Sequence, residues 1–575
     1  MAHPNSPGDP RTSHDISAIV ARLRKNDFTG YASPDDSSFI PRQRGPITAG
    51  LDPYTGNFGK EELAFLLKRC LIGVTADDLN TFSGLTLEQA VDVLLQEKST
   101  PPLPVNDYYE AVQDPNVAPL QTWVEAPWNV DVEGARIISF KSWMVKQLLD
   151  PAGSIHEKLI LFWHNHFVTE SWGVFTAKST YQYFDTLRTM AFGNFKDLTR
   201  AMTLAPAMLV YLNGNENSKN APDENYAREL QELFCIGKGP DSGYTEMDVQ
   251  SAAKVLTGWK INWLTVINEG RVASEFFAWD HDTSDKQFSG FYNDGIIAGQ
   301  TGAQGANELD ALLELIFGQI ETARHICRRL YQCFVYTDID EMTEENVIRP
   351  LADELIAVGW EIRPILRSLL MSQHFFHVEN RGAMIKHPAD ALLGLWRGLG
   401  MQLPGNFNES QQMEAYQAMM WQMEAQGMEL GDPPAVAGWP AYHQAPIFDN
   451  SWITTNTITN RALQSDSMVY WGLWNPVEPV VADLIEFTKT LEHPEDPNQL
   501  IEETCLLFLG IPLSEGARQD LKDILLSGQQ NDSYWTIAWN GMIASPTNEQ
   551  LRQLVNLRLQ LYYHTLFQFA EFQLI

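Results

Sequence analysis

The most constraining feature of this sequence is the spacing of its apolar residues, which recur every three to four positions from Glu61 onward. Side chains at this spacing share one face of an α-helix. The pattern is clear over 61–70 and 87–95, resumes over about 307–400, and returns from about 482 to the end. We therefore predict a mainly α, large, multi-helix globular protein.

Three helix starts are marked by capping boxes, in which a Ser or Thr accepts an early backbone N–H and a residue three positions later reaches back. The predicted pairs are Thr86 with Gln89, Ser154 with Glu157, and Thr245 with Asp248. A further helix is predicted over 223–236, because Pro222 favours a helix start and Gly237 a helix stop.

The helical pattern is interrupted near 260–302, where Val, Ile, Phe and Trp alternate with polar residues between glycines. This alternation predicts a small β-hairpin or irregular insert. The length of 575 residues exceeds the usual size of one domain. We divide the chain into an extended or partly disordered arm over 1–56, a helical core over 57–465, and a C-terminal helical region over 466–575 that packs on the core.

The chain is strongly acidic, with 40 Lys and Arg against 73 Asp and Glu and a formal charge of -33. Such a field repels phosphate backbones, so we expect no nucleic-acid partner. No stretch is long and apolar enough to span a bilayer, and the N-terminus lacks the pattern of a secretory signal. We expect a soluble, cytoplasmic protein. Its five cysteines are widely spaced, which predicts buried, reduced thiols.

Two histidines two positions apart, His164 and His166, stand near the end of the helix predicted to start at Ser154. Neutral imidazoles can bind zinc, iron, copper or manganese. Positions i and i+2 of a helix point about 200° apart, so both rings can share one ion only if the helix ends or distorts near Asn165. The structural alternative is that one ring fills the core and the other is a helix C-terminal cation.

Two further pairs of residues are candidate ligands. Glu229 and Glu232, at i and i+3, share a helix face in the way that metal-binding helical carboxylates do. A salt-bridged face with Arg228 is their plainer interpretation. His281 and Asp282, in the predicted insert, can supply two ligands, or a base and the carboxylate that orients it. Their plainer interpretation is turn chemistry.

Several longer stretches of sequence carry a resemblance to a known family. They are F-W-H-N-H-F at 162–167, P-A-M-L-V-Y-L at 206–212, E-N-Y-A-R-E-L-Q-E-L-F at 224–234, G-Y-T-E-M-D-V at 243–249, L-T-G-W at 256–259, H-D at 281–282, P-P-A-V-A-G-W-P at 433–440, Trp452 and Arg461. In these motifs and their order the chain resembles the bacterial family called domain of unknown function 1800, over roughly residues 60–465. The six candidate residues fall within or between these motifs.

The resemblance implies a bacterial, helix-rich protein and does not specify an activity. Members of the family often look exported, and their genes commonly lie near those of a sulfatase-like family. This implies a protein partner of that kind. The chain differs from such members because it shows no signal peptide.

A metal-dependent enzyme is the leading hypothesis, either a hydrolase that uses metal-activated water or an iron or copper oxidoreductase. The metal, a divalent or transition ion, would be bound by His164, His166, Glu229 and His281. Asp282 or Glu232 would act as a base or orient a ligand. Phosphate-loop, dinucleotide and serine-hydrolase motifs are absent from the sequence, which disfavours those mechanisms.

Two alternatives belong to other classes of protein. The first is a non-catalytic scaffold or assembly subunit, which would contact a partner or further copies of itself through its acidic surface, its Trp-rich segments and its N-terminal arm. The second is a structural protein that a metal stabilises without turnover.

Overall fold

The computed structural model describes residues 44–575 except 151, 263–264, 267–271 and 476, so most of the predicted arm over 1–56 lies outside the described residues. The first helices are α2 (Lys60–Cys70), α3 (Ala76–Phe82), α4 (Leu87–Leu94), α5 (Val130–Leu149), α6 (His156–His166), α7 (Ser171–Val174), α8 (Ala177–Met190), α9 (Phe195–Thr203), α10 (Pro206–Tyr211), α11 (Asn225–Glu229) and α12 (Glu246–Val255). A π-helix, η2 (Leu230–Cys235), continues α11.

The second half is equally helical. It contains α14 (Glu308–Phe317), α15 (Ile320–Phe334), α16 (Glu341–Thr343), the π-helix η6 (Glu344–Ile348), α17 (Arg349–Ala357), α18 (Ile362–Leu370), α19 (Pro388–Gly398), α20 (Glu409–Glu424), α21 (Thr455–Tyr470), α22 (Leu484–Thr488), α23 (Pro497–Phe508), α24 (Glu515–Leu525), α25 (Ser533–Ala544) and α26 (Glu549–Gln568). Short 3-10 helices are η1 (Gly214–Glu216), η3 (Ala278–Asp280), η4 (Gly290–Tyr292), η5 (Gly302–Asn307), η7 (Val378–Asn380), η8 (Pro440–Tyr442), η9 (Phe448–Trp452) and η10 (Ala570–Gln573). The mainly α prediction is confirmed.

The predicted insert near 260–302 consists of two small antiparallel pairs of strands. β1 (Trp259–Ile261) pairs with β2 (Ser274–Phe276), in a register that aligns Trp259 with Phe276. β3 (Lys286–Gln287) pairs with β4 (Ile296–Ile297). The prediction of a small hairpin or irregular insert is therefore confirmed.

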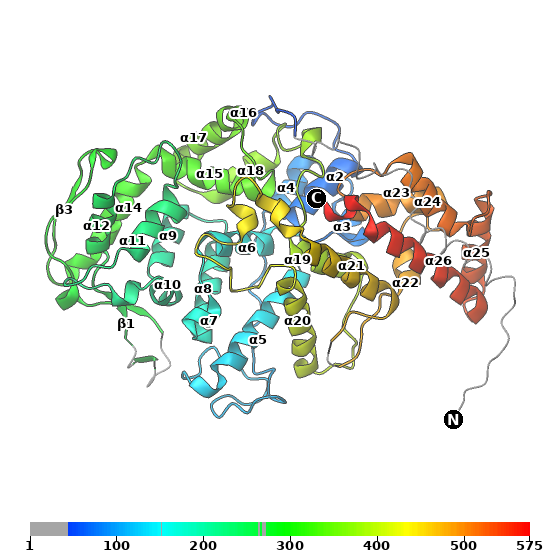
Figure 1. Cartoon of the computed structure of the whole chain (residues 1–575), viewed down its shortest axis with the longest axis horizontal. Helices are drawn as coiled ribbons and strands as arrows, with labels where there is room; N and C mark the ends of the chain where they lie inside the picture. The colour runs from blue at the N-terminus through cyan, green and yellow to red at the C-terminus, as the bar shows by residue number, and fades with distance from the viewer. Residues whose placement is uncertain (1–43, 151, 263–264, 267–271, 476) are drawn as a thin grey trace.

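Helix α6 lies in the middle of the molecule, with α9 to α14 toward one end and α22 to α26 toward the other (Figure 1). All of its residues are buried. A helix that is enclosed on every side belongs to the interior of a large protein. One continuous hydrophobic cluster surrounds it and extends from Leu63 to Phe572.

The C-terminal helices contact early parts of the chain. α23 packs against α2 and α19, and α21 packs against α19 and α26. The predicted boundary between 465 and 466 falls inside α21. The three-part division of the chain stays a prediction.

Two of the three predicted capping boxes are confirmed, at Thr86 with Gln89 and at Thr245 with Asp248. The third is wrong. Ser154 accepts the backbone N–H of His156 and donates to the carbonyl of Leu94, while both carboxylate oxygens of Glu157 bind the guanidinium of Arg188 at 2.6 and 2.9 Å. The carboxylate is buried, so an ion pair with a distant helix replaces the local cap.

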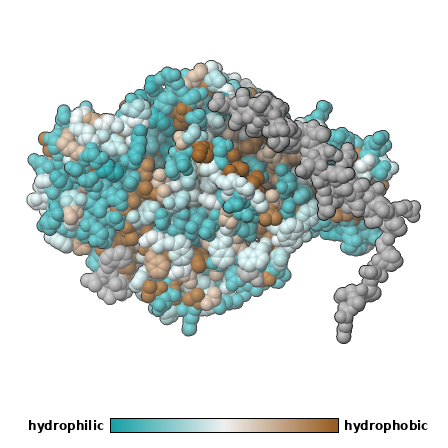
Figure 2. Space-filling view, viewed as in Figure 1, coloured by the Kyte–Doolittle hydropathy of each residue, from teal (hydrophilic) through white to brown (hydrophobic). Residues whose placement is uncertain are grey.

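The described cysteines are free, and all but Cys333 are buried. Within the described residues no helix combines the length and the apolar character that a membrane span requires. The space-filling view is mostly hydrophilic at its left end, and hydrophobic side chains gather nearer the middle (Figure 2).

Candidate functional site

His164 is fully buried on α6 and bonds through one nitrogen only. Its Nδ1 lies 3.2 Å from the hydroxyl oxygen of Tyr183, and that hydroxyl donates to the carbonyl of Phe167 at 2.5 Å. Nδ1 therefore carries the proton, which leaves Nε2 with a bare lone pair. Nε2 is buried without a hydrogen-bond partner among the described residues. Burial lowers the pKa of His164 to about 3, and Lys141 adds to the effect, so the ring is neutral.

His166 faces a different element. Its Nε2 donates to the carbonyl of Phe234 in the π-helix at 2.9 Å, and its Nδ1 is buried without a partner among the described residues. Burial and nearby Arg329 hold the pKa of His166 well below its usual value. Because α6 continues through to His166, the two imidazoles contact separate neighbours, as the i, i+2 geometry requires.

Glu229 and Glu232 lie where α11 passes into the π-helix, a local widening that is frequent at functional sites. Glu229 has one buried carboxylate oxygen without a hydrogen-bond partner among the described residues. Burial and the charge of Glu232 raise the pKa of Glu229. Glu232 forms an ion pair with Lys238, whereas Arg228 pairs with Glu246 at 2.7 Å.

His281 and Asp282 anchor the insert. His281 Nδ1 donates to the carbonyl of Thr257 at 2.9 Å, and Nε2 lies 3.1 Å from the Glu308 carboxylate. The same carboxylate binds buried Lys286 at 2.5 Å. Asp282 accepts the backbone N–H of Ser284 at 2.7 Å, which is turn chemistry.

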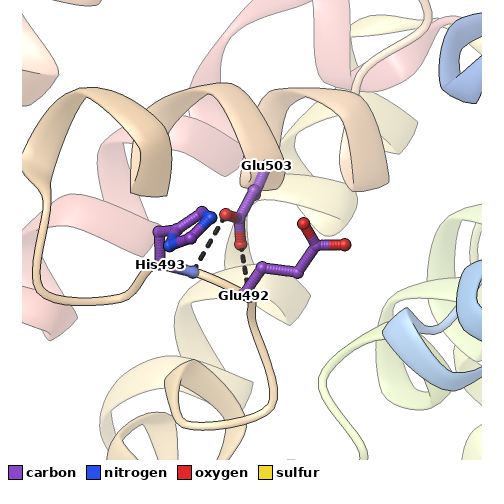
Figure 3. A group of neighbouring side chains, drawn as sticks. All are labelled: Glu492, His493 and Glu503. Atoms are coloured by element: carbon purple, nitrogen blue, oxygen red, sulfur yellow. Dashed lines mark hydrogen bonds between the residues drawn. The ribbon is translucent and has the colours of Figure 1, made fainter.

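Among the described residues, no three of these candidate ligands bring ligand atoms within 4.8 Å of one another. Among the described residues, only one group brings three His, Cys, Asp or Glu ligand atoms within 4.8 Å of one another, and it consists of Glu492, His493 and Glu503 (Figure 3). The Glu503 carboxylate accepts the backbone N–H groups of Glu492 and His493 at 2.8 and 3.0 Å. Glu492 also binds Lys60 at 2.7 Å. The carboxylates of Glu492 and Glu503 are thus already bound by protein groups, and Glu492 and His493 are exposed.

A different set of polar residues converges at the centre of the molecule, around a buried cavity of about 30 Å³. This volume accommodates water or one small group of a ligand. Helices α2, α6 and α19 and the segment 433–452 form its walls. Its polar lining residues are Arg69, Lys158, Asn165, Thr337, His387, Asp390, Trp439, Tyr442 and Asp449.

The family-like motifs at 162–167 and 433–440 meet at this cavity. The backbone N–H of Trp439 donates to Oδ1 of Asn165 at 2.8 Å. Gly438 has φ of 93°, and a Cβ at this position would lie 2.3 Å from the same oxygen. Only glycine allows the two segments to approach this closely.

A second cavity of about 30 Å³ adjoins the first, and Asp390 and Ile575 line both. Lys68 and Lys386 line the second cavity. Lys68 and Ile575 also line a surface cavity of about 380 Å³ between α2 and α23. The second cavity thus shares lining residues with both the central cavity and the surface cavity.

Three buried cations near the two inner cavities have no carboxylate within 4.0 Å among the described residues. The guanidinium of Arg69 donates to the carbonyl of Asn380 at 2.6 Å, and that of Arg461 donates to the carbonyl of Lys386 at 2.9 Å. The Lys386 ammonium donates to the carbonyl of Phe508 at 2.9 Å. Burial lowers the pKa of Arg69 and of Arg461 to about 10 and that of Lys386 to about 7.

The two carboxylates of this region are bound elsewhere. Asp390 lies 3.0 Å from the Lys158 ammonium and 3.1 Å from Nε2 of His387. Asp449 accepts the backbone N–H of Ile385 at 2.6 Å, and burial raises its pKa. The side chains around the two inner cavities are therefore mainly cationic, although the whole chain carries a charge of -33.

Sequence reasoning did not identify Arg69, Lys386 or Asp390, because no spacing along the chain relates Arg69 to the other two. Two signals were present. Lys158 directly precedes the apolar run of α6, and Lys386 precedes a His and a Pro at the start of α19. A charged residue in a fully buried helix requires a partner.

The fold and this site define a predominantly helical protein with a buried, cationic polar centre. The chain belongs to the family described as protein of unknown function (DUF1800), whose model matches residues 65–574. The resemblance is thus confirmed, and it extends well past residue 465, the end of the region over which the motifs indicated it. No match was found among curated proteins or among solved structures.

Proposed function

We propose that this protein binds a small anionic compound, with its carboxylate, phosphate or sulfate group in the two inner cavities. The observation that carries the proposal is the group of three buried cations, Arg69, Lys386 and Arg461, without a carboxylate partner within 4.0 Å among the described residues. An isolated buried ion costs several kcal/mol unless it is paired. A bound anion would offset this cost.

The hydrogen-bond donors of the region support the same chemistry. The Nε groups of Arg69 and Arg461 and the indole Nε1 of Trp439 are buried without hydrogen-bond partners among the described residues. Guanidinium N–H groups form strong, charge-assisted bonds to oxyanions. The surface cavity of about 380 Å³ falls in the size range of small-molecule sites and shares Lys68 and Ile575 with the second inner cavity.

The test is thermal unfolding of the full chain in acetate, phosphate or sulfate, compared with chloride at the same ionic strength. A specific anion raises Tm in a saturable way, because it binds the folded state only. We expect this rise of Tm to disappear in Arg461→Met. The matched control is Arg200→Met, which removes an exposed partner of Asp310 and should show the same rise of Tm as the unmodified chain.

An equal rise of Tm in Arg461→Met and in the unmodified chain would contradict anion binding at this site. Such a result would indicate a general salt effect on burial instead.

Metal-dependent hydrolysis, or oxidation with iron or copper, stays a prediction from the sequence. The bare Nε2 lone pair of His164 supports it, because a neutral imidazole nitrogen is a metal ligand. No three of the candidate ligands bring ligand atoms within 4.8 Å of one another among the described residues, which weighs against one shared ion. We derive no catalytic step through a metal.

The scaffold alternative is favoured by one surface feature. Trp421, Trp471 and Trp474 are each 45 to 58% exposed, and α20 contacts the segment after α21 through a hydrogen bond from Gln422 to the carbonyl of Trp474. Exposed Trp residues are typical of protein interfaces. If this surface drives self-assembly, Trp471→Ser with Trp474→Ser will abolish concentration-dependent association in sedimentation. A monomer at every concentration of the unmodified chain would contradict self-assembly.

A further inference from the structure

Lys68 occupies the wall between the surface cavity and the inner cavities. It stands in the last turn of α2 and lines both the cavity of about 380 Å³ and the adjoining cavity of about 30 Å³. Its ammonium nitrogen lies 2.5 Å from the carbonyl oxygen of Leu509. No carboxylate lies within 4.0 Å of it among the described residues.

The surroundings of Lys68 favour the neutral amine. Burial lowers the pKa of Lys68 to about 7. Cys505 of α23 and Lys386 are ionisable groups close to it. Burial raises the pKa of the Cys505 thiol to about 12, so it supplies no negative charge at neutral pH. Near neutral pH Lys68 therefore carries a free lone pair far more often than an ordinary lysine does.

Lys60 lines the same surface cavity and provides a contrast within one helix. Its side chain is 67% exposed, and its ammonium binds the Glu492 carboxylate at 2.7 Å. Lys60 is thus the more accessible amine, and Lys68 is the one without a carboxylate partner.

We propose that Lys68 is a nucleophilic lysine that forms an imine with a small aldehyde or ketone bound in the surface cavity. Desolvated lysines act in this way in enzymes that process carbonyl compounds. The walls beside Lys68 include Phe65, Leu506 and Leu509, so they suit a small, largely apolar carbonyl compound. The proposal does not rest on anion binding, because it uses only the surface cavity and the neutral amine of Lys68.

The reaction needs no oxidant or reductant. The Nζ lone pair of Lys68 adds to the carbonyl carbon, the carbonyl π electrons move to oxygen, and one of the two Nζ protons passes to that oxygen. The carbinolamine then loses its hydroxyl group and the remaining Nζ proton as one molecule of water. The product is a C=N bond between Nζ and the carbon of the substrate.

The test traps this imine in the full-length protein. We would incubate it with propionaldehyde and sodium cyanoborohydride at pH 7 and measure alkylation of each lysine by peptide mass spectrometry. The proposal expects Lys68 to react at least several-fold faster than Lys60 in the same sample. If Lys60 reacts as fast or faster, accessibility alone controls labelling and the proposal is overturned.

The pH dependence and two variants complete the test. Labelling of Lys68 should level off above about pH 8, where its amine is neutral, and a rate that keeps rising steeply to pH 9 would contradict the proposal. Lys68→Arg should remove the fast-reacting site, and the control Lys60→Arg should retain it. If Lys68→Arg does not fold, the comparison of the two lysines in the unmodified protein still decides.

Discussion

The backbone N–H of Trp439 donates a hydrogen bond to Oδ1 of Asn165 at 2.8 Å, joining residues 274 positions apart. This bond fixes the segment 433–440 against α6, directly beside the cationic centre. Both residues line the central cavity. The approach depends on Gly438, whose positive φ and missing Cβ leave room for Asn165.

We expect Gly438→Ala to lower the free energy of unfolding by more than about 2 kcal/mol, because its Cβ would clash with Asn165 and its φ is strained. Chemical denaturation measures the change. Asn165→Ala should remove part of this penalty in the double variant, but not all, since the carbonyl oxygen of Asn165 would also lie 2.7 Å from the new Cβ. Gly405→Ala, which meets nothing within 4 Å, is the control and should change stability little.

The network of His281, Lys286 and Glu308 predicts a strong stability effect. Glu308→Ala leaves the Lys286 ammonium buried without its carboxylate, which should cost about 3 to 5 kcal/mol. Glu314→Ala, on the same helix, removes only an exposed partner of Lys196 and should cost less than about 1 kcal/mol. Equal losses in urea unfolding would show that the network contributes no more than a surface pair.

Lys386 should make stability depend on pH. Its pKa is about 7 in the folded chain and about 10.4 when unfolded, so between these values the unfolded state binds the proton and the folded state does not. The cost of the buried charge is fully present below about pH 7 and is relieved as pH rises. Relative to Lys386→Met, the unmodified chain should gain about 1 to 3 kcal/mol between pH 7 and 9. Parallel stability curves of the two proteins would contradict this assignment.

The metal hypothesis makes its own prediction. If His164 and Glu229 bind one ion, elemental mass spectrometry of the untagged protein will find a near-stoichiometric metal that both His164→Ala and Glu229→Ala lose. Glu503→Gln is the control for the exposed group at Glu492, and it should keep that metal. If only Glu503→Gln loses the metal, the metal is bound in the C-terminal region instead. If no metal is found after loading, the metal hypothesis is wrong.

The sequence by itself determined the class of fold, the position of the insert and the family. Apolar periodicity is a local property, because each turn of helix buries the same face, and it therefore predicted helices such as α2 and α4. Two capping boxes were equally local. The histidine pair could be found because its spacing is also a local feature. We expected the two rings to point apart if the helix continued, and α6 does continue through His166.

Only the tertiary structure decided which polar residues meet. Arg69, Lys386 and Arg461 come from α2, the approach to α19, and α21, and no spacing along the chain relates them. Their common environment depends on how the helices pack, and so does the pairing of Glu157 with Arg188 in place of its predicted cap. A buried charge without a partner costs free energy, so it indicates that a partner binds there. Whether a charge is buried depends on the assembled fold and not on any short stretch of sequence.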